Sequence, residues 1–489
     1  MRDERGQTQE PLGLLIAGQW VVRDQTIPVV NSFAGEQVGA VSRGAPADID
    51  AAVGAAAASL RTPCPMHTRY DVLMRAADLL VEHQAAYALD IAREGSKTIR
   101  EARREPVRAA GILRLAAEEG RRLHGETLPF DIRPGSENRT GYYYRVPVGV
   151  VAAIMPFNDP LAVMTHKIGP AIAGGNAVVL KPDSRAPLAV LRLAAHFVEA
   201  GLPAGRLNVV TGHGEEIGDA LVADPRVRMI SFTGGAATGE HITRVAGVKK
   251  LALELGANSP VIVLADADID RAVAAIADGA FAQAGQNCLG VQRVLVHRTV
   301  FDVFAERLAD RAGRLRVGSS LEETTDVCPL ITERQAERVA EWIQEARAGG
   351  ARTLAGGRRE GAMIWPTVLT DVPEGCRLNC EEIYGPVVAL YRVDSLEEAI
   401  EKANRTPFGL HAAVFTESLR DAFAAVHGLE AGGVMVNDST DYRLDVMPFG
   451  GTKRSGIGRE GLRFALEEMT ETKVVCLNLG GGKGFRFEA

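Results

Sequence analysis

Residues 229–239 read MISFTGGAATG, and this stretch decides the fold class. Residues 229–233 are mostly apolar or strand-favouring, as is typical of a buried strand. Gly234, Gly235 and Gly239 stand where this strand passes into a helical pattern. Glycine lets the backbone approach a ligand, and a helix N-terminus favours negative charge. The stretch therefore predicts a strand, turn and helix that could receive a phosphate group, although two glycines at this spacing are also found in ordinary tight turns.

The same alternation of short apolar runs and helical stretches continues on both sides. It predicts strands at residues 149–155, 177–181, 207–211, 229–233 and 251–254, with helices between them. Repeated strand, helix and strand units form a parallel, doubly wound sheet, and ligands bind at the strand ends of such sheets. The fold class is therefore α/β with a Rossmann-like domain.

The alternation restarts after Gly256 and predicts a second α/β domain. Its elements are a strand at 261–264, a helix at 269–281 and strands at 293–297, 410–415 and 433–437. We assign residues 1–122 and 147–256 to a dinucleotide-binding domain and residues 257–456 to a catalytic domain. The join near residues 257–260 places Glu254 and Cys288 on opposite sides of an interdomain cleft, where binding sites commonly lie.

Helical patterns cover residues 46–60, 69–91 and 98–121, and the pattern then changes. Residues 123–146 contain Pro129, Pro134, Gly135 and three consecutive tyrosines, which predicts an extended arm. A last strand is expected at 472–477, followed by the glycine run 480–482. The arm, together with a tail at 470–489, would leave hydrogen-bonding edges open in a lone subunit, so we expect a homodimer or homotetramer.

Composition excludes several classes of protein. The 489-residue chain is 46% hydrophobic and 24% charged, as in ordinary globular proteins, and its formal charge of -7 gives no general attraction to nucleic acid or anionic lipid. The longest apolar stretch, 146–155, is far shorter than the roughly 20 residues that span a bilayer. The charged first five residues do not resemble a secretory signal. We therefore expect no membrane and no nucleic-acid partner.

The cysteines indicate a reducing compartment. Six cysteines are scattered without the pairing pattern of a disulfide-stapled domain, which favours the cytoplasm. Cys376 and Cys380 are four apart, but no second pair or nearby histidine completes a zinc site. We expect them to be packing residues and expect no metal.

Cys288, in AGQNCLG (284–290), and Glu254, in ELGANSP (254–260), supply a nucleophile and a base. Each also has an ordinary explanation, because cysteine is often a small buried apolar residue and a glutamate can simply be a solvated strand end. The order of further motifs decides between these readings. They are PFN (156–158), LKP (180–182), SFTG (231–234), LELG (253–256), GQNC (285–288), EEIYGP (381–386) and PFGG (448–451).

This series resembles the aldehyde dehydrogenase superfamily over about residues 12–478. The segment 432–451 is similar to the branch that includes lactaldehyde and phosphonoacetaldehyde dehydrogenases. The resemblance implies NAD(P)-dependent oxidation of an aldehyde to its acid. A thiol esterase and a non-catalytic relative are the alternatives.

The resemblance also implies catalytic roles. The Cys288 thiolate would attack the carbonyl carbon, and the Asn158 amide together with the Cys288 backbone N–H would hold the oxyanion. Asn158 could instead cap the following helix. Glu254 would activate water against the thioester, and because relatives that use coenzyme A generally lack this glutamate, we expect a free acid. Lys167 and Glu460 would form a proton path behind the base, or a plain ion pair.

For the cofactor, the resemblance assigns Lys181 to the adenosine ribose and Glu382 to the nicotinamide ribose, with Tyr384 replacing a common phenylalanine. The same site would include Phe232, Thr233, Gly234, Gly235, Gly239 and Leu255. Where NAD-preferring relatives often carry a glutamate, this chain has Ser184, followed by Arg185. Loss of that carboxylate removes repulsion of a 2'-phosphate, so NADP is slightly favoured over NAD. Asp183 argues the other way.

For the substrate, Arg443 lies before a predicted channel wall, and Arg103 and Arg104 lie on a helix that relatives use at the channel mouth. A guanidinium suits carboxylate or phosphonate, so we expect a small polar aldehyde, either anionic or hydroxylated. The remaining lining residues are expected to be Phe157, Asp159, Asn287 and Phe449. Asp159 would repel an anion unless an arginine paired with it, or it could bind a hydroxyl. The arginines could equally be surface charges, and the enzyme then a broad-range one for uncharged aldehydes.

Overall fold

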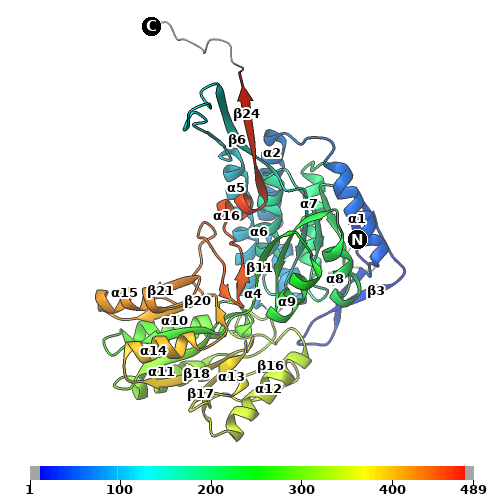
Figure 1. Ribbon diagram of the computed structural model, residues 1–489. Helices are drawn as coiled ribbons and strands as arrows, with labels where there is room; N and C mark the ends of the chain where they lie inside the picture. The colour runs from blue at the N-terminus through cyan, green and yellow to red at the C-terminus, as the bar shows by residue number, and fades with distance from the viewer. Residues whose placement is uncertain (1–10, 96, 480–489) are drawn as a thin grey trace.

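The computed structural model describes residues 11–95 and 97–479, so the glycine run at 480–482 lies outside the described residues. Figure 1 shows two α/β lobes, one above the other, and an arm that rises from the upper lobe. The predicted α/β class, with a Rossmann-like first sheet and a second α/β unit, is confirmed.

The upper lobe is built on an eight-stranded sheet of order β2-β1-β9-β8-β7-β10-β11-β23. Its five central strands are parallel: β7 (Val150–Ile154), β8 (Ala177–Lys181), β9 (Leu207–Val209), β10 (Val227–Thr233) and β11 (Lys250–Glu254). Each strand was predicted to within three residues at either end, because apolar side chains cover both faces of a buried parallel strand. The strand order reverses direction between β7 and β10, and such a point is where open α/β sheets bind ligands.

The edges of this sheet are antiparallel. β1 (Leu14–Ile16) and β2 (Gln19–Val21) close one side, and β23 (Gly456–Ile457) closes the other. β3 (Thr26–Val30) and β4 (Gln37–Ser42) form a separate hairpin. The chain therefore returns to the first sheet after it has built the second.

Helices cover both faces of the first sheet. One apolar cluster joins it to α2 (Met66–Glu82), α3 (Gln84–Glu94), α5 (Arg104–Arg121), α6 (Pro160–Ala173) and α7 (Leu188–Glu199). The other face packs against α1 (Pro46–Ser59), α8 (Gly214–Ala223) and α9 (Ala236–Val245).

Two predicted helices are each broken in two. The pattern over 69–91 is interrupted at His83, which has φ −104° and ψ 19° between α2 and α3. The pattern over 98–121 divides at Arg103 into α4 (Ile99–Ala102) and α5. Pro106 explains the second break, because it has no N–H for the Ala102 carbonyl and its ring would crowd that group.

The lower lobe contains a seven-stranded sheet of order β14-β17-β18-β13-β12-β20-β21. The strands are β12 (Ser259–Val263), β13 (Val291–His297), β14 (Arg352–Ala355), β17 (Thr367–Thr370), β18 (Val387–Val393), β20 (His411–Phe415) and β21 (Gly433–Val436). The helices are α10 (Ile269–Phe281), α11 (Phe301–Arg314), α12 (Glu333–Ala348), α13 (Arg377–Cys380), α14 (Leu396–Asn404) and α15 (Leu419–Gly428). Short pairs complete it: β15 (Arg359–Glu360) with β16 (Met363–Ile364), and β19 (Phe408–Gly409) with β22 (Thr452–Lys453).

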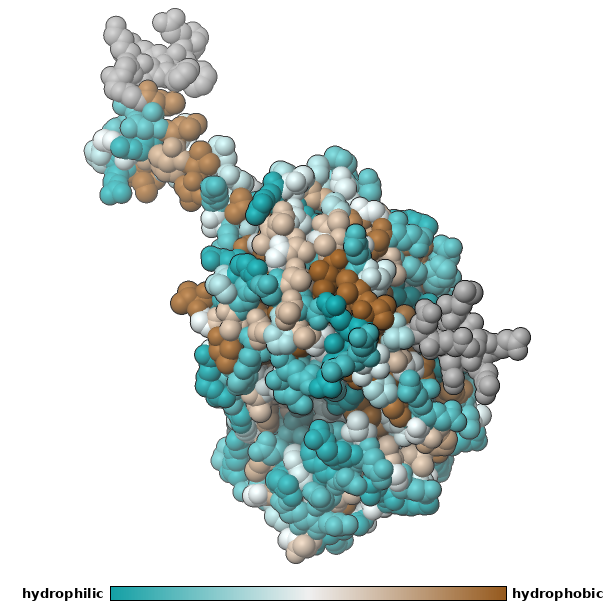
Figure 2. Space-filling model, turned by 90° about the vertical axis from the view of Figure 1, so that its right-hand side faces the viewer, coloured by the Kyte–Doolittle hydropathy of each residue, from teal (hydrophilic) through white to brown (hydrophobic). Residues whose placement is uncertain are grey.

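The arm is a three-stranded sheet. β6 (Arg139–Pro147) pairs with β5 (Glu126–Thr127) on one side and along its whole length with β24 (Thr470–Asn478) on the other; β24 follows α16 (Leu462–Glu468). Figure 2 shows the arm standing away from the body with hydrophobic groups on its surface. The side chains of Tyr142, Tyr144, Val474 and Leu477 on β6 and β24 are exposed. Within the described residues, no helix is both long and apolar enough to cross a bilayer.

Candidate active site

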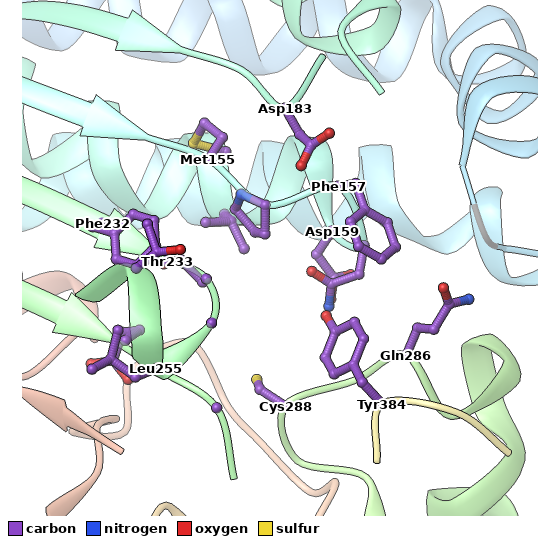
Figure 3. A pocket seen from close by; sticks show the side chains of 18 of the residues that line it. Met155, Phe157, Asp159, Asp183, Phe232, Thr233, Leu255, Gln286, Cys288 and Tyr384 are labelled. Atoms are coloured by element: carbon purple, nitrogen blue, oxygen red, sulfur yellow. The ribbon is translucent and has the colours of Figure 1, made fainter. Parts of the chain in front are cut away.

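A cavity of about 1780 Å³ opens where strand ends of the first sheet face loops of the lower lobe. Loops after β7, β8, β10 and β11 form one wall. The Cys288 loop and the segments around Glu382 and Arg443 form the other. Figure 3 shows the Cys288 thiol pointing into this space, with Thr233 and Leu255 across from it and Tyr384 beside it.

Most of the residues predicted for the site line this one cavity. They are Phe157, Asn158, Asp159, Lys181, Ser184, Arg185, Phe232, Thr233, Gly234, Gly235, Glu254, Leu255, Asn287, Cys288, Glu382, Tyr384, Arg443, Phe449, Glu460 and Arg104. Lys167 and Gly239 lie behind the lining residues. Arg103 is not part of the cavity wall, because it forms an exposed ion pair with Glu323.

The loop that carries Cys288 differs from the helix-like entry that the sequence suggested. It follows a short 3-10 turn (Ala282–Gly285) in which Gln283 and Ala284 have left-handed backbone angles, with φ of 53° and 54°. Cys288 therefore gains no helix dipole. Burial raises the pKa of its thiol, so formation of the thiolate needs a base or a local positive charge.

The Cys288 backbone N–H has no hydrogen-bond acceptor among the described residues. Its neighbours are occupied, since Leu289 N–H donates to Asn287 Oδ1 (3.0 Å) and Gly290 N–H to the Asn287 carbonyl (3.0 Å). The Cys288 N–H is thus free to receive an oxyanion.

Glu254 ends β11 and is buried beside the same cavity. Burial, and then the charge of Glu460, raise the pKa of its carboxyl well above the ordinary value, whereas Arg443 and Lys167 oppose the rise. Its Oε2 is buried without a partner among the described residues. A raised pKa suits a general base that must exchange protons near neutral pH.

Behind Glu254 lies a buried charge network. Lys167 Nζ is 3.1 Å from Glu460 Oε1 and 3.0 Å from Ser231 Oγ, and Arg443 Nη2 is 3.3 Å from Glu460 Oε2. Burial alone would raise the pKa of Glu460, but the charges of Lys167 and Arg443 hold it at about 2. The predicted Lys167 and Glu460 pair is therefore present, and Arg443 belongs to it.

Asn158 lies in the loop between β7 and α6, and its amide Nδ2 donates to Asp159 Oδ2 at 3.3 Å. The capping alternative receives no support, because the residue at the cap position of α6 is Asp159 and Asn158 accepts no N–H group of this helix. Asn158 therefore keeps its amide at the cavity wall.

Asp159 is neutralised by a lysine, where the sequence suggested an arginine. Lys97 Nζ binds Asp159 and lies 2.6 Å from Glu105 Oε2, and all three groups are largely buried. Glu105 Oε1 in turn accepts the first N–H groups of α6, from Leu161 (2.8 Å) and Ala162 (3.1 Å). Sequence reasoning missed Lys97 and Glu105, since nothing local marks them as partners of residue 159.

The wall formed by β10 and α9 can receive a dinucleotide. Gly234 and Gly239 have no positive φ; a Cβ at Gly234 would lie 2.5 Å from the Phe232 ring, and one at Gly239 would lie 2.4 Å from Leu255. The glycines thus let the turn and α9 pack closely on the strand ends. Residues 234–238 at the N-terminus of α9 line the cavity. The N–H groups of Gly234 and Thr238 donate to the carbonyls of Glu254 (3.0 Å) and Gly235 (3.1 Å), so those of residues 235–237 remain for a phosphate.

Lys181 and Glu382 complete this wall. Lys181 Nζ has the Pro182 carbonyl as its hydrogen-bond partner among the described residues, at 3.2 Å, and burial lowers its pKa. Glu382 Oε1 accepts the Ala257 N–H (3.0 Å), and burial raises its pKa to about 7. Both side chains retain capacity for ribose hydroxyls.

The position that bears on NADP is more constrained than the sequence suggested. The Arg185 guanidinium forms two hydrogen bonds to Asp183, at 2.8 and 2.6 Å, and lies over the Phe157 ring at 4.5 Å. Arg185 is therefore engaged by the neighbouring carboxylate. Ser184 lines the cavity beside it.

At the substrate end, Arg443 stacks on Phe449 at 3.7 Å and is nearly buried. Arg104 also lines the cavity, and its guanidinium makes no hydrogen bond or ion pair with any described residue. Two further cationic or titratable groups that the sequence did not single out lie beside them: Arg108, paired with Asp445 (2.7 Å), and His166, 3.0 Å from the same carboxylate. No set of three or more histidines, cysteines or acids suited to a metal occurs among the described residues.

Comparison with known proteins decides the family. The family model described as "Aldehyde dehydrogenase family" matches residues 20–475. The chain belongs to the aldehyde dehydrogenase family.

Three relatives illustrate the likeness. A 3-sulfolactaldehyde dehydrogenase of Priestia aryabhattai is 44% identical, over 96% of this chain and 98% of the relative. A lactaldehyde dehydrogenase of Methanocaldococcus jannaschii is 39% identical, over 95% of this chain and all of the relative (100%). The crystal structure of the NADP-dependent glyceraldehyde-3-phosphate dehydrogenase of Bacillus halodurans, complexed with NADP, is 37% identical, with a TM-score of 0.94 over 96% of this chain and 100% of that structure.

As an aldehyde dehydrogenase, the chain is an oxidoreductase of a family that uses NAD or NADP, as the sequence predicted. The predicted branch is confirmed as well, because relatives named lactaldehyde and sulfolactaldehyde dehydrogenase match almost the whole chain.

Proposed function

We propose that this aldehyde dehydrogenase oxidises a small polar aldehyde, anionic or hydroxylated, to the free acid through a covalent bond to Cys288. One observation carries the proposal: the Cys288 thiol and the Glu254 carboxylate line a single cavity whose walls also carry Arg443 and Arg104. A nucleophile, a base with raised pKa and two cations thus meet around one space; Arg443 is paired with Glu460, whereas Arg104 has no ion-pair partner among the described residues.

The first step is capture of the aldehyde. Because burial disfavours the thiolate, Cys288 must lose its proton as it attacks, and Glu254 is the base beside the cavity that can take it. The carbonyl oxygen gains negative charge as the carbon–sulfur bond forms. The free N–H of Cys288 and the amide of Asn158 are the donors proposed to hold it.

The α9 N-terminus, Lys181 and Glu382 are the residues that we propose hold the dinucleotide. When bound, its nicotinamide ring supplies the acceptor for the hydride of the captured carbon. Cys288 then carries a thioester. Its hydrolysis requires Glu254 to draw a proton from water, and the Glu460 and Lys167 pair behind it can pass that proton on or stabilise the charge of the base.

The cations at the far wall support an anionic or polar substrate. Arg104 has no partner among the described residues, and Arg443 is desolvated against Phe449, where a charged hydrogen bond is strong. The names of relatives agree in kind, since sulfolactaldehyde carries both a sulfonate and a hydroxyl.

Three further proposals follow from the same features. NADP is slightly favoured over NAD because Ser184 puts no carboxylate at that position, although Asp183 occupies Arg185. The cofactor is bound by a domain made of residues 1–122 and 147–256, and the chemistry takes place on a domain made of residues 257–456. The exposed apolar strands of the arm pair subunits into a dimer or tetramer. All six cysteines are free, which fits a reducing cytoplasm.

The test is a substrate panel followed by absorbance at 340 nm with NADP or NAD. Lactaldehyde, phosphonoacetaldehyde and succinic semialdehyde should be oxidised with higher kcat/KM than a long alkyl aldehyde, and Cys288→Ala should abolish every reaction. Preference for the alkyl aldehyde would refute the polar substrate. Ester hydrolysis without cofactor as the main activity would support the thiol esterase instead.

A further inference from the structure

The loop that carries Cys288 is held from outside by one segment that follows β21. Thr440 Oγ1 donates to the Leu289 carbonyl at 2.6 Å, and the Asp441 carboxylate accepts from Asn287 Nδ2. These two consecutive residues thus form hydrogen bonds with Asn287, before Cys288, and with Leu289, after it. The pairs are separated by 151 and 154 positions in the sequence, so the contact is tertiary.

Asn287 links its hydrogen bond with Asp441 to the backbone around Cys288. Its Oδ1 accepts the N–H of Leu289, which closes a local turn with Cys288 at its centre. The turn fixes the peptide group between Asn287 and Cys288, and this group carries the free N–H assigned to the oxyanion. Rotation of the Asn287 side chain would therefore disturb both the thiol and its neighbouring donor.

The segment that carries Thr440 and Asp441 is itself well anchored. Thr440 is fully buried, and its carbonyl lies 2.8 Å from His411 Nδ1 on β20. Ser439 packs against α10, where a Cβ on Gly279 would approach its hydroxyl to 2.1 Å. Asp441 thus projects from a rigid support into the cavity wall.

Burial of a carboxyl group at position 441 is energetically unfavourable. Burial raises the pKa of Asp441 to about 7, although the hydrogen bond from Asn287 and the charge of Arg108 oppose the rise, and no salt bridge to Asp441 occurs among the described residues. An apolar residue would fill the same space without that cost. Unfavourable burial of an ionisable group beside a reactive centre is typical of a functional role.

We propose that Asp441 is a positioning residue of the reaction: it locks the Asn287 side chain, and the turn closed by Asn287 sets the peptide N–H of Cys288. This inference rests on the proposed role of Cys288. Asp441 would act through Asn287 and would not need to touch the substrate.

A double-mutant cycle tests the proposal. Asp441→Ala and Asn287→Ala should each lower kcat by about 10- to 100-fold, less than the roughly 10²- to 10³-fold cost of deleting an oxyanion donor outright, because the Cys288 N–H remains but is misplaced. The double variant should be no slower than the slower single variant, within about threefold. Asp441→Asn should retain most of the wild-type kcat, since its amide oxygen can still accept from Asn287.

The controls separate positioning from general damage. Asp438→Asn, a change on the same segment outside the cavity wall, should leave kcat unchanged, and cofactor affinity should be the same in all variants. If Asp441→Ala does not fold, Asp441→Ser takes its place in the cycle, since a serine hydroxyl is too short to reach Asn287.

Independent effects that multiply in the double variant, an unchanged kcat in Asp441→Ala, or Asp441→Asn as slow as Asp441→Ala would each overturn the inference. Those results with an inactive Cys288→Ala enzyme would leave the proposed function intact. Full activity of Cys288→Ala would overturn both.

Discussion

Replacing Arg443 by methionine should lower the preference for anionic aldehydes. The Arg443 guanidinium is 11% exposed, lies 3.7 Å over the Phe449 ring and keeps one nitrogen 3.3 Å from Glu460. A charge-assisted hydrogen bond to a substrate anion contributes about 1.5–3 kcal/mol. Since each 1.36 kcal/mol is tenfold in rate, the loss corresponds to about 10- to 150-fold in kcat/KM. Methionine retains an apolar stem on Phe449, so packing changes little.

The assay compares succinic semialdehyde with a neutral aldehyde of similar length, both followed at 340 nm. Arg443→Met also removes one partner of Glu460, and this effect on the base is common to both substrates. The ratio of the two kcat/KM values isolates anion recognition and should fall about 10- to 150-fold, for the reason given above. Arg103→Met, on the exposed Glu323 pair, should leave the ratio unchanged. An unaltered ratio in Arg443→Met would refute the assignment of Arg443 to the anion.

Three further changes have defined outcomes. Glu254→Gln should lower steady-state kcat by about 10²- to 10⁴-fold. Because burial raises the pKa of Glu254, the base is protonated at low pH, and the wild-type rate should therefore rise with pH. The variant should lose that dependence in a stopped-flow and steady-state pH series. Ser184→Glu should raise KM for NADP at least about tenfold through repulsion of the 2'-phosphate, with Ser184→Gln as the uncharged control, and an equal loss with NAD would contradict the reason given. Val474→Asp on the exposed edge strand should reduce the oligomer mass measured by light scattering, whereas an unchanged mass would exclude β24 from the subunit interface.

Local patterns in the sequence predicted the parallel strands of the first sheet well, but they missed its edge strands β1 and β2 and the strands β14, β17 and β18 of the second sheet. Strand β8 and helix α10 begin and end where the apolar pattern predicted, because burial of both faces of a strand, or of one stripe of a helix, requires apolar residues at regular positions in the sequence. The breaks at His83 and Arg103 were missed, since the apolar periodicity continues across both.

The site was predicted only where a motif carries its own chemistry. Cys288, Glu254 and Lys181 could be named from short motifs, and the structure brings them to one cavity. The pairing of Lys97 with Asp159 and of Asp441 with Asn287 depends on how distant segments cross, which no local pattern records. The left-handed residues before Cys288 were missed for a different reason: neither glutamine nor alanine favours that conformation by itself.

The central claim is that the aldehyde carbon becomes bonded to the sulfur of Cys288. The most direct measurement is intact-protein and peptide mass spectrometry on Glu254→Gln enzyme mixed with NADP and an accepted aldehyde, then quenched with acid. We expect one acyl group on the peptide that contains Cys288 for each NADPH formed, and none in Cys288→Ala. NADPH formed in equal amount while Cys288 stays unmodified, or an acyl group on another residue, would contradict the account.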